Sequence, residues 1–375
     1  MSVSALASHI DSVALIDHHV HGCWLRAGDR HRFENGLNEA NVEPLADFDS
    51  AFDTQIGFAV RAHCAPLLGL PRYADADAYW NRRSEVTECE LARLFLSEAK
   101  VSDWLVDTGF ASGVADLDAL ADLSVGRVHE IVRLESVAQE AIEASDDYAT
   151  AFARLLHERA KTAIATKSIL AYRGGFDGDL SAPSPAEVAA AAQRWRDRGG
   201  TRLTDRVLLR FGLHEALRLT MPLQFHVGFG DRDCDLHSTN PLYLLDFLRV
   251  SGDTPIMLLH CYPFHREAGF LASVYPHVFL DVGLAANYVG GAATAVVSES
   301  MELAPFGKIL YSSDAYGPAE LVYTGAMQWR HATVAVLDQY LKQHGWPLDE
   351  CVRIATMIGR TNAESVYRLT DGELP

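Results

Sequence analysis

Residues 13–22 read VALIDHHVHG, a short apolar run that passes directly into a cluster of histidines. The run at 13–17 predicts a buried strand, because consecutive apolar residues are typical of a strand covered on both faces. Alternate residues of an extended chain point to the same side, so we expect His19 and His21 to converge on one point. Two converging imidazoles are natural ligands for a divalent cation, although an HxH pattern alone is a weak signal.

The same kind of apolar run recurs along the chain, and longer segments with helical periodicity separate the runs. Residues 184–198 are one such segment, with Ser184 as its N-cap and two glycines after its end. This alternation predicts parallel strands joined by helices, and eight strands favour a (β/α)8 TIM barrel of the α/β class. A doubly wound open sheet is the alternative, but no glycine-rich turn follows the first strand. The expected strands are 13–17, 104–109, 128–134, 163–170, 222–225, 255–259, 278–282 and 308–312.

The chain is longer than such a barrel requires. A TIM barrel needs about 250 residues, and the chain has 375. We expect a single domain over residues 1–375, with most of the surplus in an insertion at approximately 22–103, after the first strand. Residues 85–100 have helical periodicity, so this insertion is expected to be largely helical.

The composition excludes two classes of partner. The chain has 50 Asp and Glu against 32 Lys and Arg, a formal charge of -18, which repels nucleic acids and anionic membrane surfaces. Its six cysteines include no CxxC pair, which indicates reduced thiols. No signal peptide and no membrane-spanning apolar stretch is recognisable. We therefore expect a cytoplasmic protein that binds a small-molecule substrate, and its outer helices could form a homo-oligomer face.

Four later strands also end in residues that can bind metals. In barrels of this class the active groups come from the C-terminal ends of different strands, where one ion can collect them. A lone strand-end histidine is more often a hydrogen-bonded structural residue, and a strand-end aspartate often caps the next helix. Together with the first strand, however, these strand ends favour a metal centre. The four residues are Lys167, His226, His260 and Asp314.

These motifs resemble the amidohydrolase superfamily of metal-dependent hydrolases. Within it they are similar to the amidohydrolase-related (amidohydrolase 2) branch, which also forms the N-terminal half of nodulin/glutamine-synthetase-like fusion proteins. We expect no ATP-dependent ligation, because the sequence ends soon after the last expected strand. The resemblance extends through residues 17–22, 165–175, 224–236, 258–284, 310–315 and 359–369. It implies a metallohydrolase barrel with the metal ligands His19, His21, His226, His260 and Asp314.

The resemblance leaves the number of ions open. In dinuclear members a fourth-strand lysine is carboxylated and bridges two ions, and Lys167 stands at a compatible position. In mononuclear members Lys167 would be a structural or substrate-binding residue, and His260 would lie near the metal-coordinated water. We therefore expect one or two divalent ions. Zinc is the default for His and Asp ligands, and manganese, iron and nickel are the alternatives.

The reaction implied by the resemblance is hydrolysis of an amide C–N bond. A divalent ion lowers the pKa of its water ligand to around 7 and polarises the scissile carbonyl. Asp314 would accept the proton of that water and deliver it to the leaving amine, with His260 as the second catalytic residue.

Three arginines follow expected strands and could bind the substrate. Bidentate capture of a carboxylate is the functional interpretation, and a solvated or salt-bridged surface arginine is the alternative. We expect a substrate with a free carboxylate, for which γ-glutamyl and other amino-acid amides are the candidates. The acid-rich run at 231–235 could receive an amine of the substrate or the ammonium leaving group, but we expect it to be a turn with helix-capping residues. The three arginines are Arg133, Arg173 and Arg266.

Two other functions stay open. A metal-dependent non-oxidative decarboxylase reuses the same constellation on carboxylic acids, and the arginines suit that reaction equally well. A catalytically silent barrel could serve as a signalling or interaction module. Retention of every ligand-type position argues against the silent barrel, because such a barrel has no electrostatic reason to collect buried histidines.

Overall fold

The fold is built around one parallel sheet. The computed structural model describes residues 5–39, 50–109, 113–200 and 202–369. Within these residues seven strands form a sheet in the order β1-β3-β4-β5-β6-β7-β8, and every neighbouring pair is parallel. The strands are β1 (Leu15–Val20), β3 (Val101–Asp107), β4 (Arg127–Arg133), β5 (Ala165–Ser168), β6 (Leu223–His226), β7 (Ile256–Leu259) and β8 (Val278–Leu280).

The expected eighth strand at 308–312 is present as a closing segment without a continuous ladder. The backbone N–H of Leu310 donates to Leu280 of β8 at 2.9 Å, and His18 of β1 donates to Tyr311 at 3.1 Å. Ile309 also forms a parallel bridge with Leu280. The segment therefore joins the two edges of the sheet, as the predicted α/β barrel requires.

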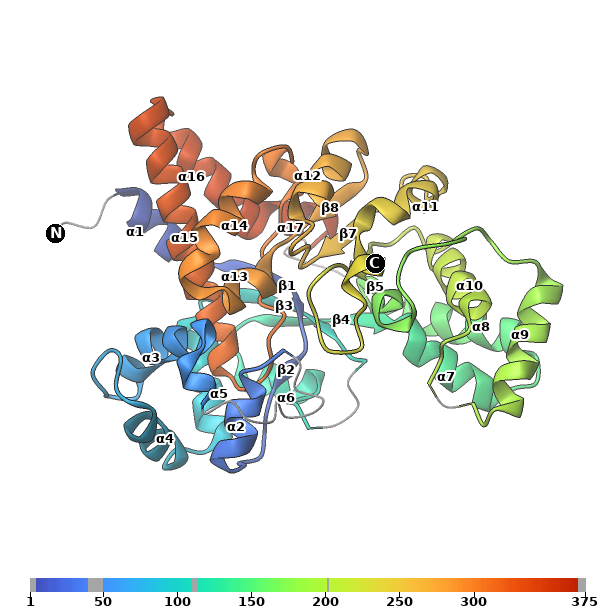
Figure 1. The fold of residues 1–375 in the computed structure, drawn as a ribbon, viewed down its shortest axis with the longest axis horizontal. Helices are drawn as coiled ribbons and strands as arrows, with labels where there is room; N and C mark the ends of the chain where they lie inside the picture. Colours follow the sequence, from blue (N-terminus) through green and yellow to red (C-terminus); the bar gives the residue numbers. More distant parts are fainter. Residues whose placement is uncertain (1–4, 40–49, 110–112, 201, 370–375) are drawn as a thin grey trace.

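Seventeen α-helices cover the sheet within the described part of the chain (Figure 1). The helix predicted at 184–198 begins after the N-cap Ser184, whose side chain accepts a hydrogen bond from the backbone of Glu187. The helices are α1 (Ala5–Ser12), α2 (Arg30–Gly36), α3 (Gln55–Leu67), α4 (Ala76–Ser84), α5 (Glu88–Glu98), α6 (Leu117–Leu123), α7 (Leu134–Ala144), α8 (Tyr148–Arg159), α9 (Pro185–Asp197), α10 (Arg206–Leu217), α11 (Leu245–Val250), α12 (His265–Val274), α13 (Gly283–Tyr288), α14 (Ala293–Ser300), α15 (Glu320–His344), α16 (Leu348–Thr356) and α17 (Asn362–Val366).

The segment after the first strand is largely helical, as predicted. It begins with β2 (Gly22–Cys23), which pairs with β9 (Tyr316–Gly317), and continues through α2 to α5. Residues 40–49 of this segment lie outside the described residues. Helices α3 and α5 pack against the long helix α15, which places the segment beside the opening of the barrel (Figure 1).

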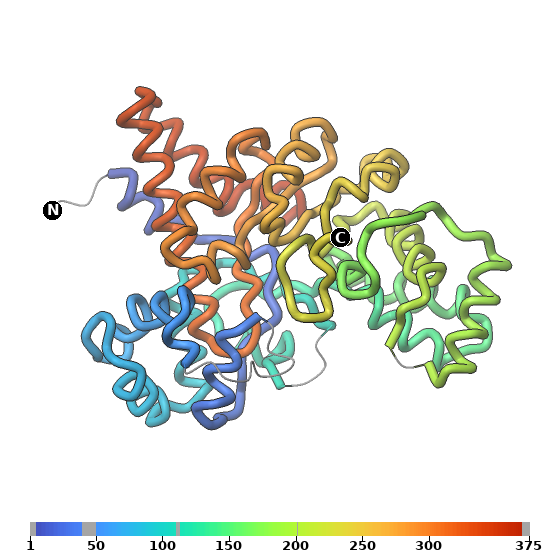
Figure 2. Tube along the Cα trace, viewed as in Figure 1, coloured from blue at the N-terminus to red at the C-terminus, as the bar shows by residue number. Residues whose placement is uncertain are grey.

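Two apolar clusters hold the strands in place. The smaller cluster fills the barrel interior, and the larger one lies between the strands and the outer helices. Helix α1 packs on α15 and α16, so the N-terminal helix lies beside two helices from the last part of the chain (Figure 2). Among the helices that the structure describes, none combines the length and apolarity needed to cross a bilayer. The interior cluster includes Ile16, Leu105, Ile131, Met257, Leu259 and Leu310.

Candidate metal centre

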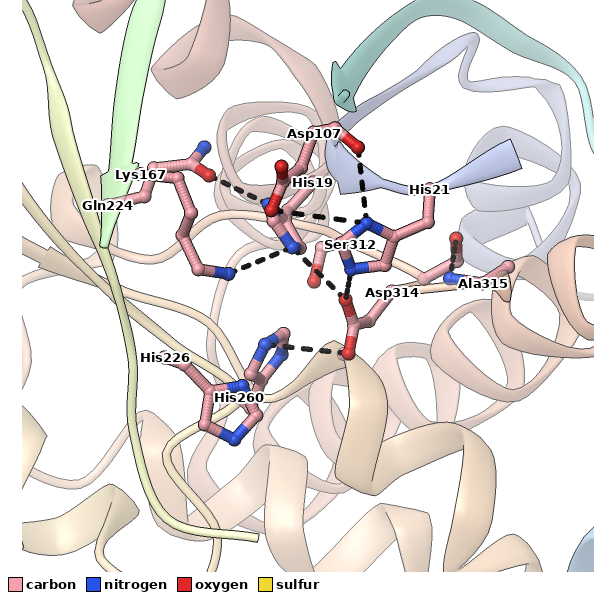
Figure 3. A network of polar contacts seen from close by, with 12 residues as sticks. His19, His21, Asp107, Lys167, Gln224, His226, His260, Ser312, Asp314 and Ala315 are labelled. Atoms are coloured by element: carbon pink, nitrogen blue, oxygen red, sulfur yellow. Dashed lines mark hydrogen bonds and ion pairs between the residues drawn. The ribbon is translucent and has the colours of Figure 1, made fainter. Parts of the chain in front are cut away.

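His19, His21 and Asp314 meet at the C-terminal end of the barrel strands (Figure 3). His19 Nε2 lies 3.1 Å from Asp314 Oδ1, and His21 Nε2 lies 3.2 Å from the same oxygen. The three ligand atoms are within 4.8 Å of one another, and all three residues are buried. The convergence predicted from the HxH spacing is therefore present, and the segment that closes the barrel supplies the carboxylate.

The donor set fits a cation at this point. His19 Nδ1 lies 2.7 Å from the side-chain oxygen of Gln224, so Nδ1 carries the proton and Nε2 carries the lone pair. That lone pair faces the Asp314 carboxylate at 3.1 Å. Lys167 Nζ lies 3.1 Å from the same nitrogen, so a positive charge already faces this lone pair. A cation between His19 Nε2 and the Asp314 carboxylate would attract both acceptors. A divalent ion bound by two imidazoles and a carboxylate would satisfy both.

The remaining predicted ligands surround this group. Lys167 Nζ lies 3.1 Å from His19 Nε2. His260 Nε2 is 3.5 Å from Asp314 Oδ2, and neither of its ring nitrogens has a hydrogen-bond partner among the described residues. The ring centroids of His226 and His260 lie 4.6 Å apart, and His226 Nε2 lies 2.9 Å from the Tyr172 hydroxyl oxygen. The structure thus brings all the predicted metal-site residues to one end of the barrel.

Burial keeps the imidazoles of His19 and His260 neutral, which is the state that binds metals. It lowers the pKa of His19 to about 3 and that of His260 to about 4. Burial also lowers the pKa of Lys167, to about 8. Burial would raise the pKa of Asp314, but His260 and His19 hold it well below its ordinary value. Near neutral pH the imidazoles of His19 and His260 are therefore neutral and the Asp314 carboxylate is ionised, as metal coordination requires.

The backbone at the site is strained. His260, Cys261 and Asp314 have φ angles of 69°, 54° and 51°, in the left-handed region that residues with a side chain rarely adopt. Asp17 holds the Asp314 segment in place, since its carboxylate accepts hydrogen bonds from the backbone N–H of Ser313 at 2.9 Å and from its hydroxyl at 2.5 Å. Strain of this kind is concentrated at functional sites, where the surrounding contacts enforce it.

A cavity of about 230 Å³ opens beside this group. Arg133 lines it and binds Asp107 through two nitrogens, at 2.7 and 3.1 Å. Arg173 lines it as well, and its buried Nε has no hydrogen-bond partner among the described residues. The other lining residues are His21, Glu39, Lys167, Ile169, Tyr172, Arg202, His226, Asp231, Asp233, Asp314 and Tyr316.

Arg266 does not lie where the sequence placed it. It belongs to the first turn of α12, and it is not among the described residues that line the cavity. Its guanidinium is exposed and pairs with Glu302 at 2.8 Å and with Glu299 at 3.1 Å. The expectation of a third arginine at the pocket edge is therefore not met. Arg202, in the loop before α10, takes that place instead.

The acid-rich run combines the expected turn with a position in the cavity wall. Asp235 caps the short helix that follows it, and Asp231 accepts a hydrogen bond from the backbone N–H of Asp233 at 2.8 Å. Asp231 and Asp233 also line the cavity, where Asp233 pairs with Arg202 at 2.7 Å. The turn expectation is therefore confirmed, and the position in the cavity wall is compatible with the alternative interpretation of this run as well.

Several residues at the site were not found from the sequence. Gln224 precedes His226 by two positions on β6, so alternation along the strand was an available signal. Asp281 follows β8 as other strand-end ligands follow their strands. Glu39 and Tyr367 follow no strand, and neither carries a comparable signal.

Comparison with known proteins identifies the family. The family model described as Amidohydrolase matches residues 128–369, which is more than half of the chain. The chain belongs to the amidohydrolase family. This confirms the resemblance predicted from the sequence motifs, and family membership supports a metal-dependent hydrolase.

Individual proteins are similar to this chain in sequence, in fold or in both. A protein of Lactobacillus casei assigned as a metal-dependent hydrolase is 29% identical to this amidohydrolase, with a TM-score of 0.83 over 98% of each chain. Protein FluG of Emericella nidulans is 24% identical over 99% of this chain, which spans 47% of the FluG sequence. Glucuronate isomerase of Caulobacter crescentus shares the fold, with a TM-score of 0.65 at 16% identity over 98% of this chain and 94% of the isomerase.

Proposed function

We propose that this amidohydrolase is a divalent-metal-dependent hydrolase of an amide C–N bond in a small metabolite that carries a free carboxylate. The observation that carries the proposal is the convergence of His19 and His21 on Asp314, with a lone pair and a carboxylate directed at one point. γ-Glutamyl and other amino-acid amides are the candidate substrates. Zinc is the expected ion, with manganese, iron and nickel as alternatives.

The residues of the site divide the work of hydrolysis. A bound divalent ion supplies Lewis acidity and lowers the pKa of a water molecule. Asp314 is ionised and faces both His21 and His260, so it can take up the proton of the attacking water and return it to the leaving nitrogen. His260 has two buried nitrogens without partners among the described residues, so one of them is available to bind the reacting oxygen.

The arginines favour an anionic group on the substrate. The charge of Arg133 is matched by Asp107, and that of Arg202 by Asp233. Arg173 forms no such ion pair among the described residues, and burial together with the charge of Arg202 lowers its pKa despite the opposing charges of Glu135 and Asp233. A substrate carboxylate would relieve this repulsion and satisfy the buried Nε of Arg173.

A substrate panel tests the proposal. Metal-loaded protein is incubated with γ-glutamyl amides, other amino-acid amides and size-matched uncharged amides, and the released amine or ammonia is measured. We expect release from the carboxylate-bearing amides and slower release from the uncharged ones. Equal rates on both groups would reject the carboxylate requirement. Carbon dioxide without amine would favour the decarboxylase, and no turnover with any substrate would favour the silent barrel.

A further inference from the structure

A chain of buried hydrogen bonds lies on the interior side of the metal centre and reaches the end of helix α17. Its members are His18 of β1, Gln224 of β6, Asp281 after β8 and Tyr367, which caps α17. The first three are fully buried, and Tyr367 is 4% exposed. None of them is among the described residues that line the cavity, so these side chains contact the metal-site residues from the interior of the barrel.

The contacts of Gln224 fix the orientation of its amide. Nε2 lies 2.8 Å from the backbone oxygen of His18, and this oxygen can only accept. The amide nitrogen must therefore point to His18, which turns the amide oxygen toward His19. At 2.7 Å from that oxygen, His19 Nδ1 is the donor, and its Nε2 is left unprotonated on the metal side.

The contacts of Tyr367 support the same orientation of the Gln224 amide. The Asp281 carboxylate accepts a hydrogen bond from His18 Nε2 at 3.1 Å, so His18 Nδ1 can accept a hydrogen bond from the Tyr367 hydroxyl at 3.0 Å. The phenol oxygen then accepts the second N–H of Gln224 at 2.9 Å. Protonating both nitrogens of His18 would leave the buried Tyr367 hydroxyl without an acceptor, because its other neighbour in this chain is a donor.

The alternative tautomer of His19 would close the metal site. With the proton on Nε2, His19 would donate directly to Asp314 Oδ1, 3.1 Å away, and both ligands would be occupied. Gln224 opposes that tautomer by offering an acceptor to Nδ1. We propose that Tyr367 is a positioning residue of the metal centre: by holding the Gln224 amide, it keeps His19 in the tautomer that presents the Nε2 lone pair to the ion. This inference rests on the metal site of the proposed function. It adds that a residue at the end of the C-terminal helix sets the tautomer of one metal ligand.

The test compares Tyr367→Phe with Tyr148→Phe. Tyr148 is an equally buried tyrosine of α8 whose hydroxyl has no hydrogen-bond partner among the described residues, so its loss removes no contact. The His19 tautomer is read in metal-free protein from ¹⁵N chemical shifts of the histidine rings, with His19→Gln to assign the signal. Zinc affinity is read by competition with a chromogenic chelator.

We expect His19 to carry its proton on Nδ1 in the wild type and in Tyr148→Phe. In Tyr367→Phe the Nε2-protonated form should appear, and zinc affinity should fall by about 10- to 100-fold, the range typical of residues that orient metal ligands. If Tyr367→Phe does not fold, Gln224→Met removes the same acceptor from His19 and should shift the tautomer in the same direction.

Two results would overturn the inference: an Nε2-protonated His19 in the wild type, or an unchanged tautomer in folded Tyr367→Phe. If Tyr367→Phe does not fold, an unchanged tautomer in Gln224→Met would overturn it. The tautomer is measured without metal or substrate. A protein that fails to hydrolyse amides, or to bind zinc, would therefore refute the proposed function while the positioning role is still decided separately.

Discussion

His19 Nε2 and Asp314 Oδ1 lie 3.1 Å apart, although the two residues belong to the first strand and to the segment that closes the barrel. The backbone enforces this contact, because the N–H of Asp314 donates to the carbonyl of His19 at 3.1 Å. The contact that closes the barrel therefore also brings the metal ligands together. It holds ligands from opposite ends of the chain in fixed positions.

Asp314→Asn should abolish most turnover in metal-loaded protein. The amide cannot take up the proton of the attacking water, and loss of a general acid–base group typically costs about 10²–10⁴-fold in rate. Steady-state kinetics at saturating metal measure the effect, with Asp338→Asn on the outer part of α15 as the control. Near-normal kcat in Asp314→Asn would remove the proton-transfer role from this residue.

Arg173→Met and Arg266→Met are a matched pair of variants that tests which arginine binds the substrate carboxylate. Arg173 lines the cavity, whereas Arg266 pairs with Glu299 and Glu302 outside it. Loss of a hydrogen bond to a charged group costs about 1.5–3 kcal/mol, so the KM for a carboxylate-bearing amide should rise by roughly 10- to 100-fold in Arg173→Met. Arg266→Met should behave as the wild type. The reverse pattern would place the substrate carboxylate elsewhere.

Sequence alone located most ligands of the candidate site, for a simple physical reason. Parallel strands end at one edge of a sheet, so polar residues directly after apolar runs must gather there. His226 follows such a run on β6 and His260 follows one on β7, and each strand position fixes where the side chain begins. The structure places both where the apolar pattern predicted.

The residues that the sequence misplaced or missed also have physical explanations. Arg266 follows a strand, but the direction of the next helix turn decides whether a side chain faces the cavity or the solvent, and no local pattern encodes that direction. Tyr367 reaches the site because α17 docks under the barrel, a long-range contact. The strand expected at 308–312 is joined to its neighbours by scattered hydrogen bonds, and just after it the backbone N–H of Ser313 donates to the Asp17 carboxylate and not to the backbone of a neighbouring strand.

Arg83→Met should destabilise the fold by uncoupling the helical segment from the barrel. The Arg83 guanidinium is 3% exposed and binds Glu88 at 2.8 Å and Glu320 of α15 at 2.7 Å. Its removal leaves two buried carboxylates unpaired, which costs about 3–5 kcal/mol. Urea unfolding measures the loss.

Arg82→Met is the control for this substitution, because Arg82 makes an exposed pair with Glu85. Surface pairs contribute at most about 1 kcal/mol. Equal unfolding free energies for the Arg83→Met and Arg82→Met variants would show that the buried pairs do not anchor the segment.

The histidine pair between α3 and α15 should make stability depend on pH. The rings of His63 and His331 lie 5.1 Å apart. Burial, with the charges of His331 and Arg72, lowers the pKa of His63 from 6.5 to about 4. The unfolded chain binds more protons between these values, so this histidine makes the free energy of unfolding rise with pH across that window.

NMR titration of the His63 ring should give a pKa near 4 in the wild type and a higher value in His331→Gln, which lacks the neighbouring charge. A wild-type His63 that titrates near 6.5 would contradict the burial argument.

The divalent metal content per chain, measured by mass spectrometry on protein purified without chelator, tests the central claim most directly. We predict at least one ion per chain in the wild type and none in the double variant His19→Gln/Asp314→Asn. Two ions in the wild type would favour the bridging role of Lys167, and one ion the mononuclear centre. A wild-type protein without a divalent ion, or a double variant with the wild-type content, would contradict a metal centre at these residues.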